Sequence, residues 1–433
     1  MSRAFLSASS ALLIDRIFRA GIGLLVGIAI ARHYGPAEFG QLSYVLLAAS
    51  LFGGLATLGL DEMGPRDMAA MPYSHLSRED MLKTILRMRS IGGLLAYVLL
   101  VLFVYLELGV DVTWWIALIL GLYLPLQSAD AFEYRFRVEG KFLLIALTRS
   151  LSALCSSTLK ILSVFFGWPI YVIAASMTGE YACNGWIFSR INRTQFGIGG
   201  AFNRPYAKLL LSRSWKIMLA GVMIALQVRI EYYLIEKMMS WSDVGQYSAA
   251  LKIFEILDVV PIIFSLILMP QLALSLHGAS EEKLKQSFQG SYLSGLLIYL
   301  ALIPVMLIII WAFPLAFGKQ YLAAQALLPL LMIRPLFGMF NAIRGIYVIL
   351  EHRYFFPLLS ASIGLLISFS AAYLLIPVYG LLGAVIANLL GLLGSTILAD
   401  LLFYRKSTVA LATCFQQSHS LIEKLRSFRI TTK

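Results

Sequence analysis

Long apolar runs recur along this chain of 433 residues, and they constrain the fold more than any other feature. A helix that crosses a bilayer needs about 20 mostly apolar residues. Such windows can be cut at the charged or Pro/Gly-bearing breaks between them, at 10–33, 39–62, 86–106, 112–133, 142–166, 167–189, 213–238, 245–272, 290–314, 322–348, 353–376 and 381–404. The pattern predicts an all-α polytopic membrane protein with about twelve transmembrane helices. Fusion of the two windows that meet at Gly167–Pro169 would reduce the count to eleven.

Composition agrees with a membrane protein. Apolar residues make up 59% of the chain and charged residues only 13%, which is too little charge to cover the surface of a soluble protein of this length. The three cysteines are scattered without CxxC spacing, so the sequence predicts neither a disulfide framework nor a thiolate metal site. No GxxxxGK[ST] phosphate loop and no HExxH motif occurs, so direct use of ATP and a cofactor are not expected.

Lysine and arginine are concentrated in alternate loops. The loops opposite to these hold little more than Arg32, Lys237 and Lys319. Because cytoplasmic loops of membrane proteins carry the excess of Lys and Arg, this asymmetry places both termini in the cytoplasm. It also accounts for most of the net charge of +12, so no nucleic-acid partner is expected.

A short internal repeat indicates how the windows are grouped. Residues 38–43, EFGQLS, open the second window, and residues 243–248, DVGQYS, open the eighth at an offset of 205 residues. An even number of helices in each repeat predicts two parallel six-helix bundles around a central cavity. The expected domains are an N-terminal bundle (1–189), a cytoplasmic linker (190–212), a C-terminal bundle (213–404) and a cytoplasmic tail (405–433).

Several basic residues lie inside the apolar windows. A cation in the middle of a bilayer costs about 2.5 to 3.5 kcal/mol on insertion scales unless it faces water or a partner. Local ion pairs are one explanation, because Asp15 lies one helical turn from Arg19 and Lys252 lies three residues before Glu255. The other explanation is a cavity bordered by cations from several helices, which would stabilise an anionic ligand such as a diphosphate. The sequence leaves both explanations open.

Four segments carry a family resemblance that covers nearly the whole chain in order. They are ARHYGPAEFGQLSYVLLAASLFGGLATLGLDEMGPRDMA from Ala31, VGQYSAALKIFEILDVVP from Val244, FGKQYLAAQALLPLL from Phe317 and LLIPVYGLLGAVIANLLG from Leu374. They resemble polysaccharide repeat-unit flippases of the Wzx type, within the multidrug/oligosaccharidyl-lipid/polysaccharide exporter (MOP) superfamily.

The resemblance implies a transporter rather than an enzyme. It would flip an undecaprenyl-diphosphate-linked oligosaccharide across the bacterial inner membrane, by alternating access driven by an ion gradient, for O-antigen, capsule or exopolysaccharide synthesis. Membrane lipids, a polymerase and chain-length proteins are the other expected partners. The substrate headgroup is expected to contact Arg19, Arg149, Arg229, Lys252 and Arg334. The acids expected to couple transport to an ion are Asp61, Glu255 and Asp258.

Three alternatives differ in substrate or chemistry. A drug or cation antiporter of the same superfamily would prefer an acidic cavity, which Arg229 and Arg334 oppose. A lipid II flippase of the related peptidoglycan branch would carry two further helices. A membrane polymerase or ligase would need a sizeable outer loop for acceptor chemistry, and no predicted outer loop exceeds about ten residues.

Overall fold

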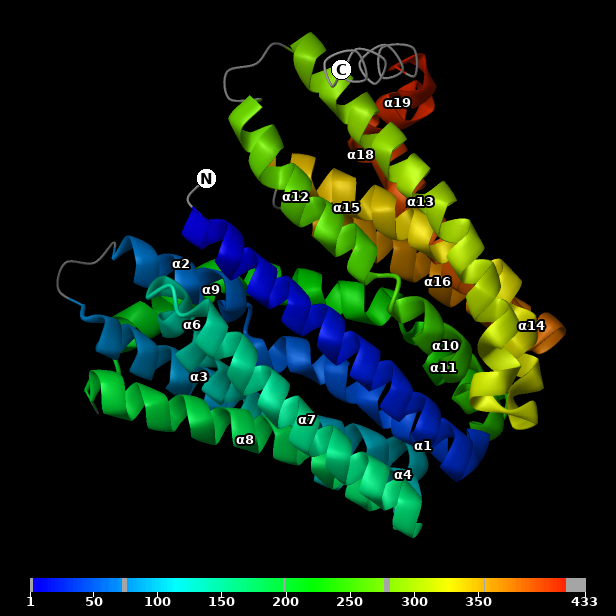
Figure 1. Ribbon diagram of the computed structural model, residues 1–433, viewed down its shortest axis with the longest axis horizontal. Coiled ribbons are helices and arrows are strands. Elements are labelled where there is room, and N and C mark those ends of the chain that lie inside the picture. Colours follow the sequence, from blue (N-terminus) through cyan, green and yellow to red (C-terminus); the bar gives the residue numbers. More distant parts are fainter. Residues whose placement is uncertain (1–2, 72–75, 198, 276–280, 354, 418–433) are drawn as a thin grey trace, which may run out of the picture. The chain divides into compact units, whose positions relative to one another are not determined.

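The computed structural model describes residues 3–71, 76–197, 199–275, 281–353 and 355–417. Every element in these ranges is helical, which confirms the predicted all-α class (Figure 1). The α-helices of the N-terminal part are α1 (Arg3–Thr57), α2 (Leu60–Ala70), α3 (Arg78–Leu108), α4 (Val112–Gly121), α5 (Tyr123–Leu126), α6 (Ala131–Val138), α7 (Phe142–Phe166), α8 (Ile170–Phe196), α9 (Arg204–Gln227) and α10 (Ile230–Met238). Those that follow are α11 (Trp241–Glu255), α12 (Val259–Ser275), α13 (Glu281–Phe317), α14 (Leu322–Leu331), α15 (Arg334–Leu350), α16 (Phe356–Tyr379), α17 (Leu381–Leu393), α18 (Ala399–Phe403) and α19 (Arg405–Ala412).

Four shorter elements complete the fold. They are the 3₁₀ turns η1 (Gln127–Asp130), η2 (Lys319–Tyr321) and η4 (Cys414–Gln417) and the π-helical turn η3 (Gly394–Leu398). Only the first part of the predicted tail, through residue 417, falls within the described residues.

Eight helices in the described ranges are long and apolar enough to cross a membrane, or nine if the bent pair α14 and α15 forms one span. The chain is therefore a multi-pass membrane protein. The predicted twelve spans exceed this number because breaks interrupt several apolar windows, as between α9 and α10 and between α11 and α12. The window 10–33 and most of the window 39–62 lie in α1, and Gly35 turns the chain between them with a positive φ of 76°. The count of twelve stays a prediction.

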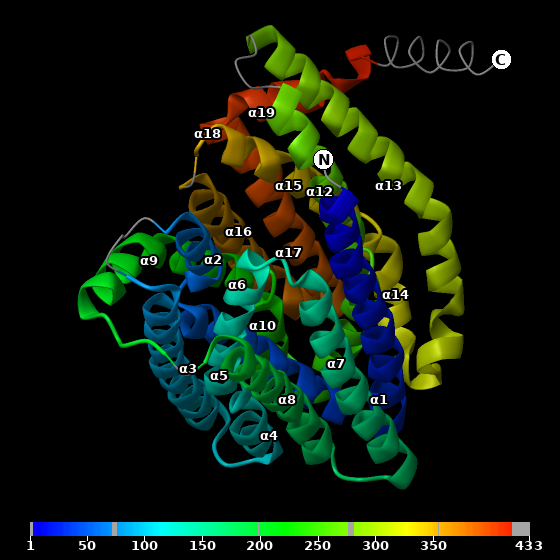
Figure 2. The same cartoon turned by 60° about the vertical axis from the view of Figure 1, so that its left-hand side comes forward.

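The chain divides into two compact units. Unit 1 comprises residues 1–249 and 317–321, and unit 2 comprises residues 250–316 and 322–433. In unit 1, α1 packs against α3 and α7, and α7 packs against α8 (Figure 2). In unit 2, α16 packs against α17, and α12 against α15. The expected linker is largely helical, since α8 continues to Phe196 and α9 begins at Arg204. The predicted bundles, 1–189 and 213–404, stay a prediction.

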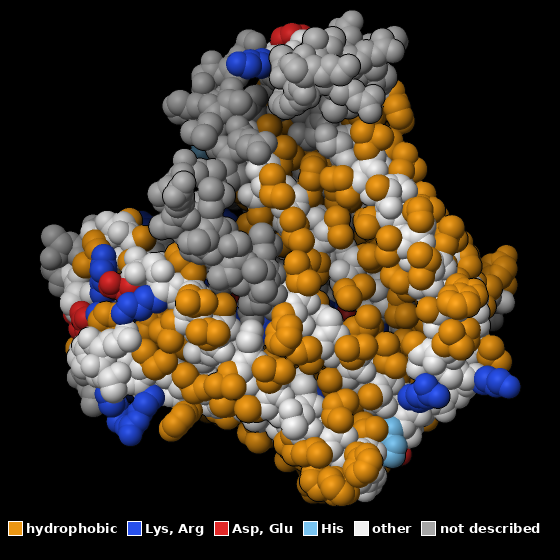
Figure 3. Space-filling model, viewed as in Figure 1, with side chains coloured by type: hydrophobic (Ala, Val, Ile, Leu, Met, Phe, Trp, Pro, Cys, Tyr) orange, Lys and Arg blue, Asp and Glu red, His pale blue; other side chains and the backbone are white. Residues whose placement is uncertain are grey.

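Apolar surface covers the sides of the helices. On the face visible in Figure 3, hydrophobic side chains cover much of the described surface, whereas the visible Lys and Arg side chains lie toward its margins. Exposed large side chains of α3 include Leu94, Leu102 and Leu106. A soluble protein rarely exposes such a continuous apolar surface, which matches contact with lipid tails.

The two copies of the sequence repeat meet inside unit 1. Ser248 donates a hydrogen bond from its Oγ to the Oγ of Ser43 at 2.7 Å, and these residues are 205 positions apart. A Cβ atom on Gly40 would overlap the carbonyl oxygen of Trp241, and one on Gly245 would overlap that of Pro36. Gly40 and Gly245 are again 205 positions apart. Contacts between equivalent residues arise where a two-fold axis passes between two segments, so this crossing has local two-fold symmetry.

Candidate functional site

Helix breaks position the charged residues inside the membrane-spanning helices. Arg229 lies between α9 and α10, where its φ of −135° and ψ of 0° interrupt the helix. Asp258 lies between α11 and α12, and Arg334 begins α15 after the bend of 48° that follows α14. Asp61 follows the break at Leu58 and Gly59, whose φ angles are 53° and 68°. Broken helices in membranes leave backbone groups that must face protein or a water-filled cavity, so such breaks commonly mark ligand sites.

A polar cavity of about 280 Å³ lies within unit 1. Four carboxylates line it, from α2, η1, α6 and α8: Asp61, Asp130, Glu133 and Glu180. Three arginines line it as well, from α1, α6 and α7: Arg19, Arg137 and Arg149. Tyr181 and Asn184 of α8 add neutral hydrogen-bonding groups. We call this space the polar cavity.

Ion pairs hold the walls of the polar cavity. Arg149 lies 2.5 Å from Glu133 and 3.9 Å from Asp130, between Nη2 and the carboxylate oxygens. Glu133 also accepts hydrogen bonds from Arg137, one turn further along α6. Lys160 of α7 lies 3.9 Å from Glu180 of α8. The cavity therefore presents paired charges, which can accept and donate hydrogen bonds to a polar ligand without a large net charge.

Asp61 is held by a basic residue that was not among the predicted site residues. Arg89 of α3 is 1% exposed, and its Nη1 lies 2.5 Å from Asp61. Tyr134 of α6 also donates to Asp61 and accepts from Arg89. The apolar window 86–106 includes Arg89, but mean hydropathy does not record that this charge is buried against an acid, since a buried pair lets a charge enter the helix. The sequence signal for such a partner was Asp61 itself, a carboxylate within the apolar window 39–62.

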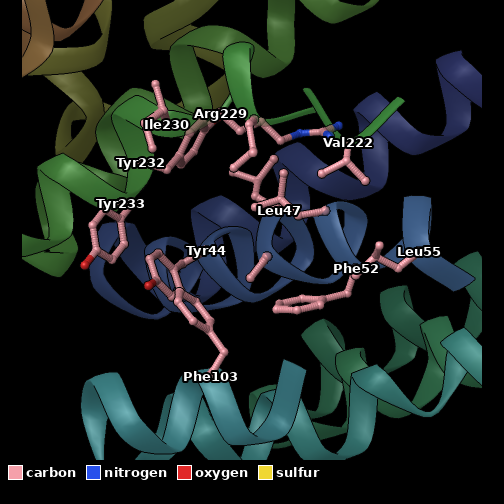
Figure 4. Close-up of a pocket in the computed structure, with 13 residues that line it drawn as sticks. Tyr44, Leu47, Phe52, Leu55, Phe103, Val222, Arg229, Ile230, Tyr232 and Tyr233 are labelled. Atoms are coloured by element: carbon pink, nitrogen blue, oxygen red, sulfur yellow. The ribbon is translucent and has the colours of Figure 1, made fainter. Parts of the chain in front are cut away.

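A second cavity of unit 1, of about 350 Å³, is mostly apolar. Leu47, Leu51, Phe52 and Leu55 of α1 line it together with Phe103 of α3 and Val222 and Leu226 of α9. Arg229 and three tyrosines supply its polar groups. In Figure 4, Arg229, Tyr232 and Tyr233 lie on one side of this space and Tyr44, Phe52 and Phe103 on the other. We call this space the apolar cavity.

Six of the eight predicted site residues lie in three places. Arg19, Arg149 and Asp61 line the polar cavity, and Arg229 lines the apolar cavity. Arg334 lies 3.6 Å from Asp258 within unit 2.

The remaining two predicted residues lie on α11. Glu255 is exposed and Lys252 is half-buried, and no ion pair joins them in the part of the chain that the structure describes. The local pair suggested for these two residues is thus wrong. The pair suggested for Asp15 and Arg19 lies outside the described side chains. Their predicted functional roles stay predictions.

Solved structures with the same fold are of transporters and a flippase rather than of enzymes. The inward closed conformation of the lipid II flippase MurJ matches with a TM-score of 0.64 and 17% identity, over 94% of this chain and 92% of that one. The eukaryotic MATE transporter AtDTX14 matches with a TM-score of 0.58 and 13% identity, over 95% and 100% of the two chains.

A third solved structure is a MOP superfamily transporter from Pyrococcus furiosus, described as having a binding pocket of reverse polarity. It matches with a TM-score of 0.55 and 13% identity, over 95% of this chain and 96% of that one. No curated protein matches the sequence. The family model of the polysaccharide biosynthesis proteins matches residues 6–276, more than half of the chain. With the fold of MOP superfamily transporters and this match, the chain belongs to the polysaccharide biosynthesis protein family.

Proposed function

We propose that this protein flips undecaprenyl-diphosphate-linked oligosaccharide repeat units across the bacterial inner membrane, for the synthesis of O-antigen, capsule or exopolysaccharide. Transport proceeds by alternating access and draws on an ion gradient. Membership of the polysaccharide biosynthesis family supports the glycan, and the fold supports transport. The excess of Lys and Arg in alternate loops supports an orientation with both termini in the cytoplasm.

The position of Arg229 is the observation that carries this proposal. It lies at a helix break and lines a cavity, and it forms no ion pair with an acid among the described residues. Arg229 is half-buried within an apolar window, and a cation there is costly unless it faces water or a counter-charge, so this position favours an anionic ligand for part of the transport cycle. A diphosphate supplies several charged oxygens that a guanidinium binds through paired hydrogen bonds.

The polar cavity suits binding of the saccharide and coupling of transport to an ion. Sugar hydroxyls are neutral donors and acceptors, and the paired carboxylates and arginines of this cavity offer the complementary groups. Among the three acids expected to couple transport to an ion, we favour Asp61, because it lines the cavity with half of its side chain exposed. Protonation of Asp61 would weaken its pair with Arg89 and so change how α2 is held against α3.

A cation antiporter is the second candidate, and the four carboxylates of the polar cavity favour it. The two functions separate in a transport assay with purified protein in vesicles. The vesicles receive a short diphosphate-linked isoprenoid oligosaccharide, lipid II or a quaternary-ammonium drug in parallel. We expect movement of the lipid-linked oligosaccharide, stimulated by an imposed ion gradient. Transport of the drug alone would assign the protein to the antiporters, and transport of lipid II alone to the peptidoglycan branch.

A further inference from the structure

The apolar cavity of unit 1 has walls that suit a hydrocarbon. Leucine side chains of α1 form one wall, and Phe52 and Phe103 close part of another (Figure 4). A space of about 350 Å³ is large enough for part of a lipid chain but not for a whole one of many isoprene units. Apolar cavities do not hold water well, because water there loses its hydrogen-bond partners. A hydrocarbon occupant is therefore favoured.

Two polar groups show that this occupant is not a plain hydrocarbon. Arg229 brings a positive charge to the edge of the apolar cavity. Tyr44 lines it too, with the side chain 3% exposed and a buried hydroxyl that has no hydrogen-bond partner among the described residues. A buried hydroxyl without a partner costs free energy comparable to a lost hydrogen bond. A ligand that joins an alkyl chain to an anionic, hydrogen-bonding group would satisfy both residues.

Aromatic residues lie between the two cavities. The hydroxyl of Tyr123 of α5 lies beside Gly53 of α1, the chain neighbour of Phe52 in the apolar cavity. The ring of Tyr123 lies 4.9 Å from that of Tyr181, between ring centroids, and Tyr181 lines the polar cavity. Unit 1 thus offers a hydrocarbon site with a cation at its edge, a pair of tyrosines and a polar site. A lipid-linked sugar carries the matching chemistry: isoprenoid, diphosphate and saccharide.

We propose that the apolar cavity binds the isoprenoid carbons next to the diphosphate of the substrate, with Arg229 at the diphosphate and Leu47 and Leu51 against the chain. This inference rests on the proposed function and adds to it a tail-binding site within unit 1. It predicts that the protein recognises the lipid as well as the saccharide. Hydrocarbon and diphosphate should then contribute separately to binding.

The test narrows the apolar cavity with a larger side chain and compares a diphosphate that carries an isoprenoid tail with one that carries none. The full-length protein in lipid nanodiscs is titrated with farnesyl diphosphate and, separately, with inorganic diphosphate. Leu51→Trp should weaken the binding of farnesyl diphosphate by about tenfold or more, since displacing two buried methylene groups already accounts for that factor. It should leave the binding of inorganic diphosphate unchanged. Arg229→Gln should weaken the binding of both ligands.

Matched variants keep the result interpretable. Leu102→Trp places the same ring on α3, where Leu102 is 47% exposed, and should bind both ligands as the wild type does. Leu47→Phe adds less volume to the cavity and serves if Leu51→Trp does not fold. Equal affinity for farnesyl diphosphate in Leu51→Trp, Leu47→Phe and the wild type would overturn the tail site.

Flipping of the lipid-linked oligosaccharide by the wild type is measured in parallel. Flipping with unchanged binding in the cavity variants would remove the tail site and leave the proposed function standing. Neither flipping nor binding of farnesyl diphosphate by the wild type would overturn both.

Discussion

Arg344 in unit 2 and Arg149 in unit 1 both lie within helices of a membrane protein, but their surroundings differ. Arg344 is 9% exposed and lies 3.1 Å from Asp400, and it also donates to the carbonyl of Ser395 and to Asn341. Arg149 pairs with Glu133 at 2.5 Å, yet its side chain remains 29% exposed and lines the polar cavity. The first arrangement is packed and closed, whereas the second leaves room for a ligand. The pair of Arg149 with Glu133 is therefore the better candidate for a role in ligand binding.

The largest expected effect is on the closed pair of unit 2. Arg344→Leu leaves Asp400, with a side chain 7% exposed, buried without its counter-charge. We expect this variant to lose about 3 to 5 kcal/mol of unfolding free energy. Thermal or denaturant unfolding of the purified protein measures the loss.

The control for this pair removes both charges. The double variant Arg344→Leu with Asp400→Leu should recover most of the lost stability, because no uncompensated charge remains. Normal stability of Arg344→Leu, combined with loss of transport, would contradict the structural role given to this pair.

A change at Gly40 tests whether close packing at the crossing of the two repeat segments in unit 1 contributes to stability, as the Arg344 pair does in unit 2. Gly40→Ala places a methyl group against the backbone of Trp241, so the two segments must separate. We expect a loss of about 1 to 3 kcal/mol of stability, the usual cost of overpacking. Gly21→Ala, in the same helix and without a neighbour within 4 Å, should be neutral or slightly stabilising in the same unfolding measurement. Equal effects of the two changes would argue against the close approach.

Arg149→Gln should separate function from stability. Glu133 keeps its second arginine, Arg137, so we expect a stability loss of only about 1 to 2 kcal/mol. Flipping should fall by about tenfold or more, which corresponds to about 1.4 kcal/mol in the limiting step. Flip rates per folded protein in vesicles measure this effect. If stability fell as far as in Arg344→Leu while the flip rate stayed normal, Arg149 would belong with the closed pairs.

The smallest effect is expected at Glu255. This side chain is exposed on α11 and lines neither cavity of unit 1. Glu255→Gln should change stability by less than about 0.5 kcal/mol and leave the gradient dependence of flipping intact. Asp61→Asn, the matching change in the polar cavity, should reduce that dependence. The reverse result would restore Glu255 as the coupling acid predicted from the sequence.

Hydropathy and turn residues predicted where the helices lie better than they predicted which side chains contact one another. The window 142–166 coincides with α7, and the Gly35–Pro36 turn divides α1 where a break was expected. The repeat at an offset of 205 marks two segments that meet through Ser43 and Ser248, a contact that the repeat itself did not predict.

Contacts between charges could not be predicted in the same way. The pairs of Arg89 with Asp61 and of Arg149 with Glu133 depend on the rotation of each helix about its axis. Packing sets this rotation, and mean hydropathy along a window does not record it. The breaks beside Arg229 and Arg334 were also missed, because both residues lie within otherwise apolar windows.

The most direct test of the account compares Arg229→Gln with Arg190→Gln in vesicles that contain the diphosphate-linked isoprenoid oligosaccharide. Arg190 is exposed near the end of α8 and lines neither cavity of unit 1, so its variant controls for loss of one positive charge. We predict that Arg229→Gln abolishes most flipping while the protein stays folded, and that Arg190→Gln flips as the wild type does. Equal flipping by Arg229→Gln and the wild type would contradict the assignment of Arg229 to the diphosphate.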